Sequence, residues 1–218
     1  MLQFLYHKDS GEKNIILDNQ AFHHVFNVRR QKDSILILAN MLDSKLYSYK
    51  ILQVGKKQAT LELIDSKSIK QNSPKTHIIQ AIIDMNEFSK TLPYLNELFV
   101  EKITFFYSDF SQRNEKINIE KLHKILLNSS MQCGRLSIMK IEIMKNLNEV
   151  LNIYRDSIAL DFNDNRINIK NHNSFIIGAE GGFSKNEREL LKDRLFGIDN
   201  PLIMRAKTAS IFVAANKI

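Results

Sequence analysis

Hydrophobic and polar residues follow two different patterns along the chain and divide it into two parts. Up to about residue 65, apolar positions come in short runs bounded by polar turns, which is typical of β-strands. After Asp18, a residue that can cap a helix, the spacing becomes helical as far as about Val28. Several short strands without alternating helices predict a small β-barrel. The predicted strands are Leu2–Tyr6, Asn14–Leu17, Ile35–Ala39, Leu46–Val54 and Ala59–Ile64.

Beyond a polar segment the pattern changes to alternating strands and helices. Ser66–Lys75 is polar, contains a proline and lacks periodicity, so we expect it to link two domains. The alternation after it predicts an α/β domain with a parallel sheet covered by helices. Predicted strands are Ile78–Ile83, Ile103–Tyr107, Ile138–Ile143, Ile158–Phe162, Phe175–Ile177 and Leu202–Met204. Predicted helices are Glu87–Val100, which Pro93 should kink or shorten, Ile119–Met131, Leu147–Tyr154, Ser184–Leu195 and one from about Lys207.

Residues 175–191 form the best candidate for a binding site. Phe175–Ile177 is an apolar run of the kind found in doubly buried strands. Three of the seven glycines lie in Gly178–Gly182, where they would allow a ligand to approach the backbone closely. Ser184 and Glu187 form an S-x-x-E capping box, which predicts the start of a helix. This unit would place backbone groups at the carboxyl edge of a sheet, where α/β proteins bind ligands. A tight connection without a ligand is the alternative.

Two common phosphate-binding motifs do not fit this turn. The chain contains no G-x-x-x-x-G-K-[ST], and the spacing G-x-x-G-G differs from the dinucleotide motif G-x-G-x-x-G. We therefore expect a ligand that is held by its edges and its shape rather than by a pyrophosphate.

The net charge of +7 is concentrated in the first part of the chain. Residues 1–75 hold 12 lysines and arginines against 7 acids, whereas residues 76–218 hold 19 against 17. A basic module beside a nearly neutral ligand-binding module suggests an anionic partner, with nucleic acid as the first choice. An ordinary solvated surface is the alternative. Candidate phosphate-binding residues in this part are Arg29, Arg30, Lys32, Lys56 and Lys57.

Other features of the sequence predict a cytosolic protein without a metal site. No apolar run approaches the roughly 20 residues of a membrane-spanning helix, and the amino terminus lacks the apolar core of a signal peptide. Cys133 is the only cysteine, which excludes an internal disulfide framework and any multi-cysteine metal site.

Six segments, in the same order along the chain, resemble the motifs of one family. I-G-A-E-G-G-F-S-K-N-E resembles I-G-P-E-G-G-x-S-x-x-E, Q-C-G-R resembles E-Q-[SC]-x-R, and I-M-R-A-K-T-A resembles I-L-R-T-E-T-A. N-E-L-F-V is similar to E-L-G-V, S-Q-R-N to S-E-R, and F-H-H-V-F-N-V-R-R to H-x-x-x-V-L-R. The chain thus resembles the RsmE family of 16S rRNA uridine-N3 methyltransferases in the SPOUT superfamily.

The resemblance implies a fold and an activity. Residues 1–68 would form a PUA-like β-barrel that binds RNA. Residues 74–218 would form a SPOUT methyltransferase domain, an α/β domain with a mainly parallel sheet and a trefoil knot. The protein would be a cytoplasmic homodimer with its active site at the dimer interface and no membrane contact. It would use S-adenosylmethionine (S-adenosyl-L-methionine) to methylate N3 of a uridine in 16S rRNA of the small ribosomal subunit, uridine 1498 in the family.

The resemblance also implies roles for individual residues. Arg135, reaching over from the partner subunit, and Arg205 would lie near the point of methyl transfer as catalytic residues. Arg29, Arg30 and Arg113 would bind RNA. No convincing general base is apparent. The residues that would hold the cofactor are Leu160, Ile177, Gly178, Glu180, Gly181, Gly182, Leu202, Ile203 and Met204.

The sequence departs from the family pattern at several positions, and two alternatives stay open. Lys207 stands where a glutamate is usual, which reverses a charge near the site. The alternatives are a SPOUT methyltransferase that acts on tRNA and a non-catalytic RNA-binding ribosome-assembly factor of the same fold. The other departures are Ala179 for proline, Tyr94 for lysine, Phe99 for glycine and Met131 for glutamate.

Overall fold

The chain forms two compact units in a computed structural model that describes residues 4–28, 34–71, 75–112, 114–200 and 202–217. Unit 1 comprises Met1–Asn72 and Leu127–Ile138, and unit 2 comprises Ser73–Leu126 and Met139–Ile218. The division falls within a helix, α4 (Ile119–Cys133). Residues 127–138 therefore count with unit 1, although the sequence pattern assigns them to the second domain. The functional boundary between residues 68 and 74 stays a prediction.

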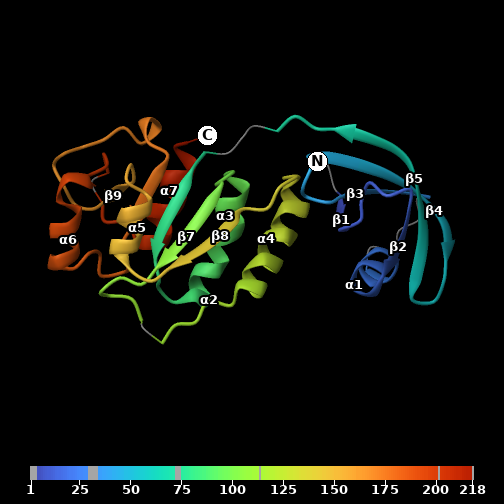
Figure 1. Cartoon of the computed structure of the whole chain (residues 1–218), viewed down its shortest axis with the longest axis horizontal. Helices are drawn as coiled ribbons and strands as arrows, with labels where there is room; N and C mark the ends of the chain where they lie inside the picture. Colours follow the sequence, from blue (N-terminus) through green and yellow to red (C-terminus); the bar gives the residue numbers. More distant parts are fainter. Residues whose placement is uncertain (1–3, 29–33, 72–74, 113, 201, 218) are drawn as a thin grey trace. The chain divides into compact units, whose positions relative to one another are not determined.

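Unit 1 is built on a curled five-stranded sheet with the strand order β1-β3-β4-β5-β2 (Figure 1). Neighbouring strands are antiparallel except for the parallel pair β1 and β3. The helical turns α1 (Asn19–Phe22) and η1 (His23–Val28) contribute Phe22 and Val25 to the core beneath the sheet. The predicted strands of this part are confirmed, the first of them only at Leu5–Tyr6, since Leu2 and Gln3 lie outside the described residues. Their bounds are β1 (Leu5–Tyr6), β2 (Asn14–Asp18), β3 (Ile35–Ala39), β4 (Lys45–Val54) and β5 (Gln58–Ser68), which enters the predicted linker.

The segment after α4 packs within unit 1 through both apolar and polar contacts. Leu136 is buried in a cluster with Phe4 and Met41. The side chain of Gln71 donates to the carbonyl of Gly134 at 2.8 Å and accepts from the amide of Leu136 at 2.8 Å. One glutamine thus holds the segment that contains Arg135.

Unit 2 contains a six-stranded sheet in which every pair of neighbours is parallel. The order is β11-β9-β10-β6-β7-β8, and β6 lies near the centre with all five residues buried. Such burial on both faces is typical of parallel sheets. The predicted parallel α/β sheet is therefore confirmed. The strands are β6 (His77–Ala81), β7 (Lys102–Phe106), β8 (Lys140–Met144), β9 (Ile158–Leu160), β10 (Ser174–Ile177) and β11 (Leu195–Phe196).

Helices cover both faces of this sheet. Gln80 of β6 is hydrogen-bonded to Ser210 of α7, whereas the ring of His77 packs edge-on against Tyr154, which follows α5. His77 and Gln80 are three residues apart in one strand and so point to opposite faces. Among the described residues, none of the helices combines the length and the hydrophobicity needed to cross a membrane. The other helices of unit 2 are α2 (Met85–Phe88), α3 (Leu92–Glu97), α5 (Leu147–Ile153), α6 (Lys185–Leu191) and α7 (Ala206–Ala215), with 3₁₀ turns η2 (Ser89–Thr91), η3 (Ile169–Asn171) and η4 (Lys192–Arg194).

Three sequence predictions in unit 2 need correction. Leu202–Met204 is not a strand but an irregular segment, with Leu202 73% and Ile203 78% exposed. The helix α6 ends at Leu191 rather than at Leu195. Leu195 instead begins β11, a strand that follows η4 and pairs with β9. The predicted helix Glu87–Val100 is divided into α2, η2 and α3, and its proline lies in the first turn of α3, where no backbone donor is needed.

Candidate active site

A cavity of about 730 Å³ lies in unit 2 where β9 and β10 end. Its walls are the glycine turn after β10, the segment before α7, and the start of α7 itself. The carboxyl edge of a parallel sheet is the usual ligand site in α/β proteins. The structure brings to this cavity every residue that the family resemblance suggested for the cofactor: Leu160, Ile177, Gly178, Glu180, Gly181, Gly182, Leu202, Ile203 and Met204.

Two positions of the glycine turn favour glycine, one because a side chain would clash and one because of its backbone conformation. A Cβ atom on Gly178 would lie 2.9 Å from the backbone of Gly182. Gly182 has a φ of +74°, in the left-handed region that favours glycine, and its amide donates to the carbonyl of Ala179 at 2.9 Å. Ala179, in place of the family's proline, therefore keeps the turn closed through its carbonyl. The predicted role of glycine at this turn has a direct geometric reason.

The helix after the turn is capped as the sequence predicts, and its cap also holds a second loop. Ser184 and Glu187 form a reciprocal capping box at the start of α6. The Glu187 carboxylate accepts from the amide of Asp109 at 3.1 Å, and the Ser184 hydroxyl donates to the Asp109 carboxylate. The loop after β7 is thereby fixed, and its Phe110 lies beside Gly181.

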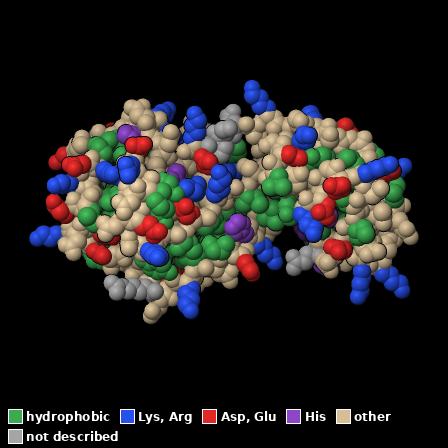
Figure 2. Space-filling model, in the orientation of Figure 1, with side chains coloured by type: hydrophobic (Ala, Val, Ile, Leu, Met, Phe, Trp, Pro, Cys, Tyr) green, Lys and Arg blue, Asp and Glu red, His purple; other side chains and the backbone are tan. Residues whose placement is uncertain are grey.

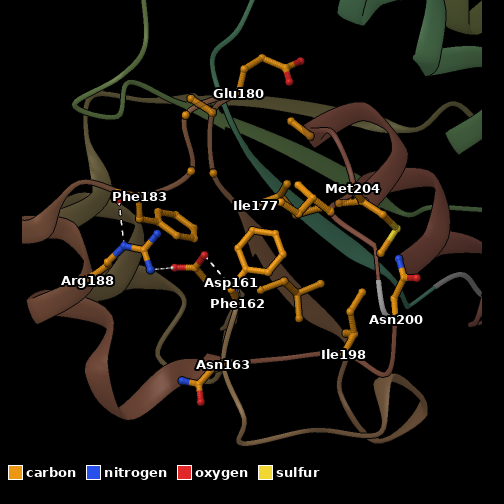
Figure 3. Close-up of a pocket in the computed structure, with 18 of the residues that line it drawn as sticks. Asp161, Phe162, Asn163, Ile177, Glu180, Phe183, Arg188, Ile198, Asn200 and Met204 are labelled. Atoms are coloured by element: carbon orange, nitrogen blue, oxygen red, sulfur yellow. Dashed lines mark hydrogen bonds and ion pairs between the residues drawn. The ribbon is translucent and has the colours of Figure 1, made fainter.

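An ion pair that sequence reasoning missed forms another part of the cavity wall. The guanidinium of Arg188 pairs with the Asp161 carboxylate and donates to the carbonyl of Phe183 at 3.0 Å (Figure 3). The Asp161 side chain is only 5% exposed, so the pair satisfies a nearly buried charge. Position alone could have signalled Asp161, because it directly follows the end of β9. Beside it, Phe162 is 67% exposed and extends toward Ile177 in Figure 3. Glu180, by contrast, turns its carboxylate away from the other labelled side chains (Figure 3).

The two predicted catalytic arginines belong to different units. Arg205 is exposed, directly follows the cavity residue Met204, and is the residue before the first turn of α7. Arg135 lies in unit 1, is 3% exposed, and donates from Nε to the hydroxyl of Ser137 at 3.0 Å. The predicted RNA-binding residues Arg29, Arg30 and Arg113 lie outside the described residues.

The reversed charge at position 207 has an acidic partner. The ammonium of Lys207 lies 3.5 Å from a carboxylate oxygen of Glu87 in α2. Glu87 is also paired with Lys90 at 2.6 Å, and this hydrogen bond, together with Lys207, holds the pKa of Glu87 below its ordinary value. The positive charge that replaces the family's glutamate is therefore matched by an ionised acid on a neighbouring helix.

A partly buried polar cluster lies on the face of the sheet opposite to α7. The ring of His77 contacts the hydroxyl of Thr104 at 2.8 Å and that of Ser174 at 3.0 Å. Thr104 donates to the Glu142 carboxylate at 2.7 Å. We call this group the His77 cluster; its members are His77, Lys102, Thr104, Glu142, Tyr154 and Ser174.

Comparison with known families identifies both units. A model described as an RNA methyltransferase domain matches residues 70–217, and a model described as an RNA methyltransferase PUA domain matches residues 17–64. The PUA-like part of the predicted fold is therefore confirmed. The trefoil knot stays a prediction.

Relatives and solved structures extend this likeness over the whole chain. Ribosomal RNA small subunit methyltransferase E of Helicobacter pylori is 37% identical over 98% of both chains, and the enzyme of that name from Aquifex aeolicus is 22% identical over 97% of both. A Legionella pneumophila protein described as a putative methyltransferase with bound SAM has a TM-score of 0.82 at 24% identity, covering 98% of this chain and 94% of its own.

The Neisseria gonorrhoeae ribosomal RNA small subunit methyltransferase E, bound to S-adenosyl methionine, has the same fold. Its TM-score is 0.81 at 17% identity, and the match covers 99% of this chain and 96% of its own. The 37% sequence identity to the Helicobacter pylori enzyme, over 98% of both chains, agrees with the six motifs. The chain belongs to the family of ribosomal RNA small subunit methyltransferase E.

Proposed function

We propose that the protein methylates N3 of a uridine in 16S rRNA with S-adenosylmethionine as the methyl donor. The observation that carries this proposal is the gathering of the nine residues that the family resemblance suggested for the cofactor, from three segments of the chain, around one cavity. Family membership supports the reaction class, and the names of the curated relatives point to small-subunit ribosomal RNA. Because ribosomal RNA is the proposed substrate, we place the protein in the cytoplasm.

The cavity suits the proposed cofactor in size and in the chemistry of its walls. Its volume of about 730 Å³ falls within the roughly 300–1,000 Å³ of small-molecule sites. Leu160, Ile177 and Met204 offer apolar surface for an adenine ring, and the backbone of the glycine turn is accessible at its edge. Two solved structures of the same fold are described as holding this molecule. The residues present therefore fit the cofactor.

The main contribution that we expect from this chain is to hold the methyl donor and the uracil in line. The cofactor, when bound, would supply a methyl group on a sulfonium for in-line displacement. Holding two reactants in line can contribute roughly 7–11 kcal/mol in well-oriented cases. The uracil N3 proton must leave, and the positive charge of Arg205, beside the positive end of the α7 dipole, favours the anionic base. Arg205 would thus stabilise the charge that develops on the base.

We further propose that the active protein is a homodimer in which Arg135 of one subunit serves the site of the other. The family motif around Q-C-G-R supports this role. Mixing Arg135→Ala and Arg205→Ala proteins tests it, because a mixed dimer would contain one site with both arginines intact. We expect each variant alone to be inactive and the refolded mixture to recover about a quarter of the activity, the share of sites that a statistical mixture completes. No recovery in a confirmed dimer would contradict action across the interface.

We propose that unit 1, which includes Arg29 and Arg30, binds RNA together with Arg113 of unit 2. Unit 1 matches a PUA domain model, and the first 75 residues hold most of the net positive charge. On the face seen in Figure 2, its Lys and Arg side chains are interspersed with acidic ones rather than gathered in one patch.

Two measurements test the proposed reaction. Isothermal titration with S-adenosylmethionine should show binding in the micromolar range, and S-adenosylhomocysteine should compete. Mass mapping of 16S rRNA from a deletion strain should show the loss of one 3-methyluridine, which the gene restores. An intact 16S pattern with a methyl group missing from tRNA would favour the tRNA alternative. RNA binding without any methyl incorporation would favour the assembly factor.

A further inference from the structure

Two walls of the cavity, the glycine turn and the start of α7, are connected by one buried side chain. Gln80 is fully buried in the central strand β6, directly before its last residue. Its register partner in β10 is Ile177, the residue that precedes the glycine turn. Gln80 therefore lies beside the end of β10, where the chain leaves the sheet and forms the glycine turn of the cavity wall.

Both ends of the Gln80 amide are used in this position. The Nε2 group donates to the carbonyl of Gly178 at 3.2 Å and to that of Ala81 at 2.9 Å. The Oε1 atom accepts from the hydroxyl of Ser210 at 2.8 Å. Two carbonyl partners and one hydroxyl partner fix which end of the amide is nitrogen. No apolar side chain of the same length could form these hydrogen bonds.

Ser210 belongs to the second wall. It is fully buried in α7, directly after Ala209 and four residues after Ala206, both of which line the cavity. Residues four apart lie on one face of a helix, so the hydrogen bond from Ser210 to Gln80 fixes the helix face that also bears Ala206. The connection from α7 through Gln80 to Gly178 is thus a continuous chain of hydrogen bonds between the walls.

We infer that Gln80, with Ser210, is a positioning residue that sets the separation of the two walls and thereby the affinity for S-adenosylmethionine. This inference rests on the proposed function. The tight turn explains why a single carbonyl matters: Gly178 already approaches the backbone of Gly182 closely, so its movement carries the whole turn with it. Removing the amide leaves the Gly178 carbonyl and the Ser210 hydroxyl buried without this partner, and the turn then relaxes outward.

The test compares variants that remove hydrogen bonds near and far from the cavity. Gln80→Met keeps the length of the side chain without its polar atoms, and Ser210→Ala is a milder change should Gln80→Met fold poorly. Thr104→Val is the matched control, because Thr104 is also fully buried in a neighbouring strand but bonds within the His77 cluster. We expect Gln80→Met to raise the Kd for S-adenosylmethionine at least tenfold and Ser210→Ala several-fold. Thr104→Val should lower Tm without changing Kd, and no variant should change the KM for RNA.

A second measurement does not depend on the cofactor. Hydrogen exchange at the Gly182 amide, which donates within the turn, should accelerate at least tenfold in Gln80→Met and stay unchanged in Thr104→Val. A combined Gln80→Met and Ser210→Ala protein should bind no more weakly than Gln80→Met alone, because both changes break one connection. Wild-type affinity in Gln80→Met, or unchanged exchange at Gly182, overturns the inference. If the wild type itself fails to bind S-adenosylmethionine, the proposed function is wrong, and exchange at Gly182 alone decides the positioning role.

Discussion

Gly178 and Gly181 both line the cavity, yet a methyl group added to each would meet different neighbours. At Gly178 it would lie 2.9 Å from the Gly182 backbone, whereas at Gly181 it would lie 3.2 Å from the ring of Phe110, which is 54% exposed. A side chain can move aside, but the backbone of a closed turn cannot. We therefore expect Gly178→Ala to cost about 1–3 kcal/mol of unfolding free energy and to abolish cofactor binding.

Gly181→Ala is the matched control for this prediction, since it adds the same methyl group further along the same turn. It should retain most of the stability and bind the cofactor within a few-fold of the wild type. Urea unfolding and titration calorimetry check both variants. Equal effects of the two changes would contradict the role of close backbone approach.

The pKa values of two residues in the His77 cluster are shifted, so we expect the free energy of unfolding to depend on pH. Burial lowers the pKa of His77 to about 4, with Lys102 acting in the same direction. Below pH 6.5 the unfolded chain therefore takes up a proton before the folded one does, and the free energy of unfolding falls by about 3 kcal/mol as the pH falls from 6.5 to 4. For Glu142, burial acts to raise the pKa, but hydrogen bonds from Tyr154 and Thr104 outweigh it and leave the pKa below its ordinary value.

The lowered pKa of Glu142 acts in the same sense, because its contribution is present above its ordinary pKa and is lost as the pH falls. Urea unfolding between pH 8 and 4 measures the sum. His77→Gln should flatten the slope between pH 6.5 and 5 while leaving that part of the decline which Glu142 causes at lower pH. A slope that is unchanged in His77→Gln would show that another group is responsible.

Motifs revealed the residues of the cavity that lie next to each other in sequence, and missed those that meet only in space. The glycine turn and Leu202–Met204 could be predicted because each is a continuous segment with its own signature. The pair Asp161–Arg188 and the hydrogen bond between Gln80 and Ser210 could not, because their members are 27 and 130 residues apart. A single sequence carries no signal for such pairs.

At the scale of elements, the end of α3 shows why a family glycine is favoured where this chain has Phe99. The amide of Phe99 bonds to the carbonyl of Asn96 at 3.2 Å, and the amide of Val100 bonds to that of Leu95 at 3.0 Å. This pattern is a Schellman motif, whose C′ residue adopts the left-handed conformation. Phe99 has a φ of +61°, a strained value for a bulky side chain.

Because of the left-handed backbone at position 99, we expect glycine to be more stabilising there than alanine, the reverse of their usual order. Both Phe99→Gly and Phe99→Ala remove the ring, so their difference reports the backbone alone. We expect Phe99→Gly to be more stable than Phe99→Ala by about 1 kcal/mol, because alanine still carries a Cβ atom into the left-handed region. Chemical denaturation of the two variants measures the difference. A more stable alanine variant would contradict the strain.

Element type could be predicted better than element length. The strands of both sheets apart from β11 were recognised because buried parallel strands and alternating antiparallel strands have distinct patterns. Leu202–Met204 was mistaken for a strand, since an apolar segment that lines a cavity has the same composition as one that enters a sheet. The division of Glu87–Val100 into shorter helices follows from Pro93, although its exact boundaries could not be read from the sequence.

At the scale of the whole molecule, the net positive charge of residues 1–75 leads us to expect that RNA affinity falls as the salt concentration rises. Arg29→Ala with Arg30→Ala should weaken RNA binding and reduce the slope of log K against log salt by about 0.7–0.9 for each phosphate that the protein no longer binds. The Kd for S-adenosylmethionine should not change. Lys124→Ala with Lys145→Ala, at exposed positions of unit 2, removes the same charge and serves as control. Equal effects of the two variants would indicate a general influence of net charge rather than specific phosphate binding.

The distance in sequence between Gln80 and Ser210 has a consequence for synthesis of the protein. The strands β3, β4 and β5 of unit 1 are complete within the first 68 residues, but the cavity needs β6, the turn after β10 and the first turns of α7. A chain still being translated can therefore pair these early strands long before it can hold a methyl donor.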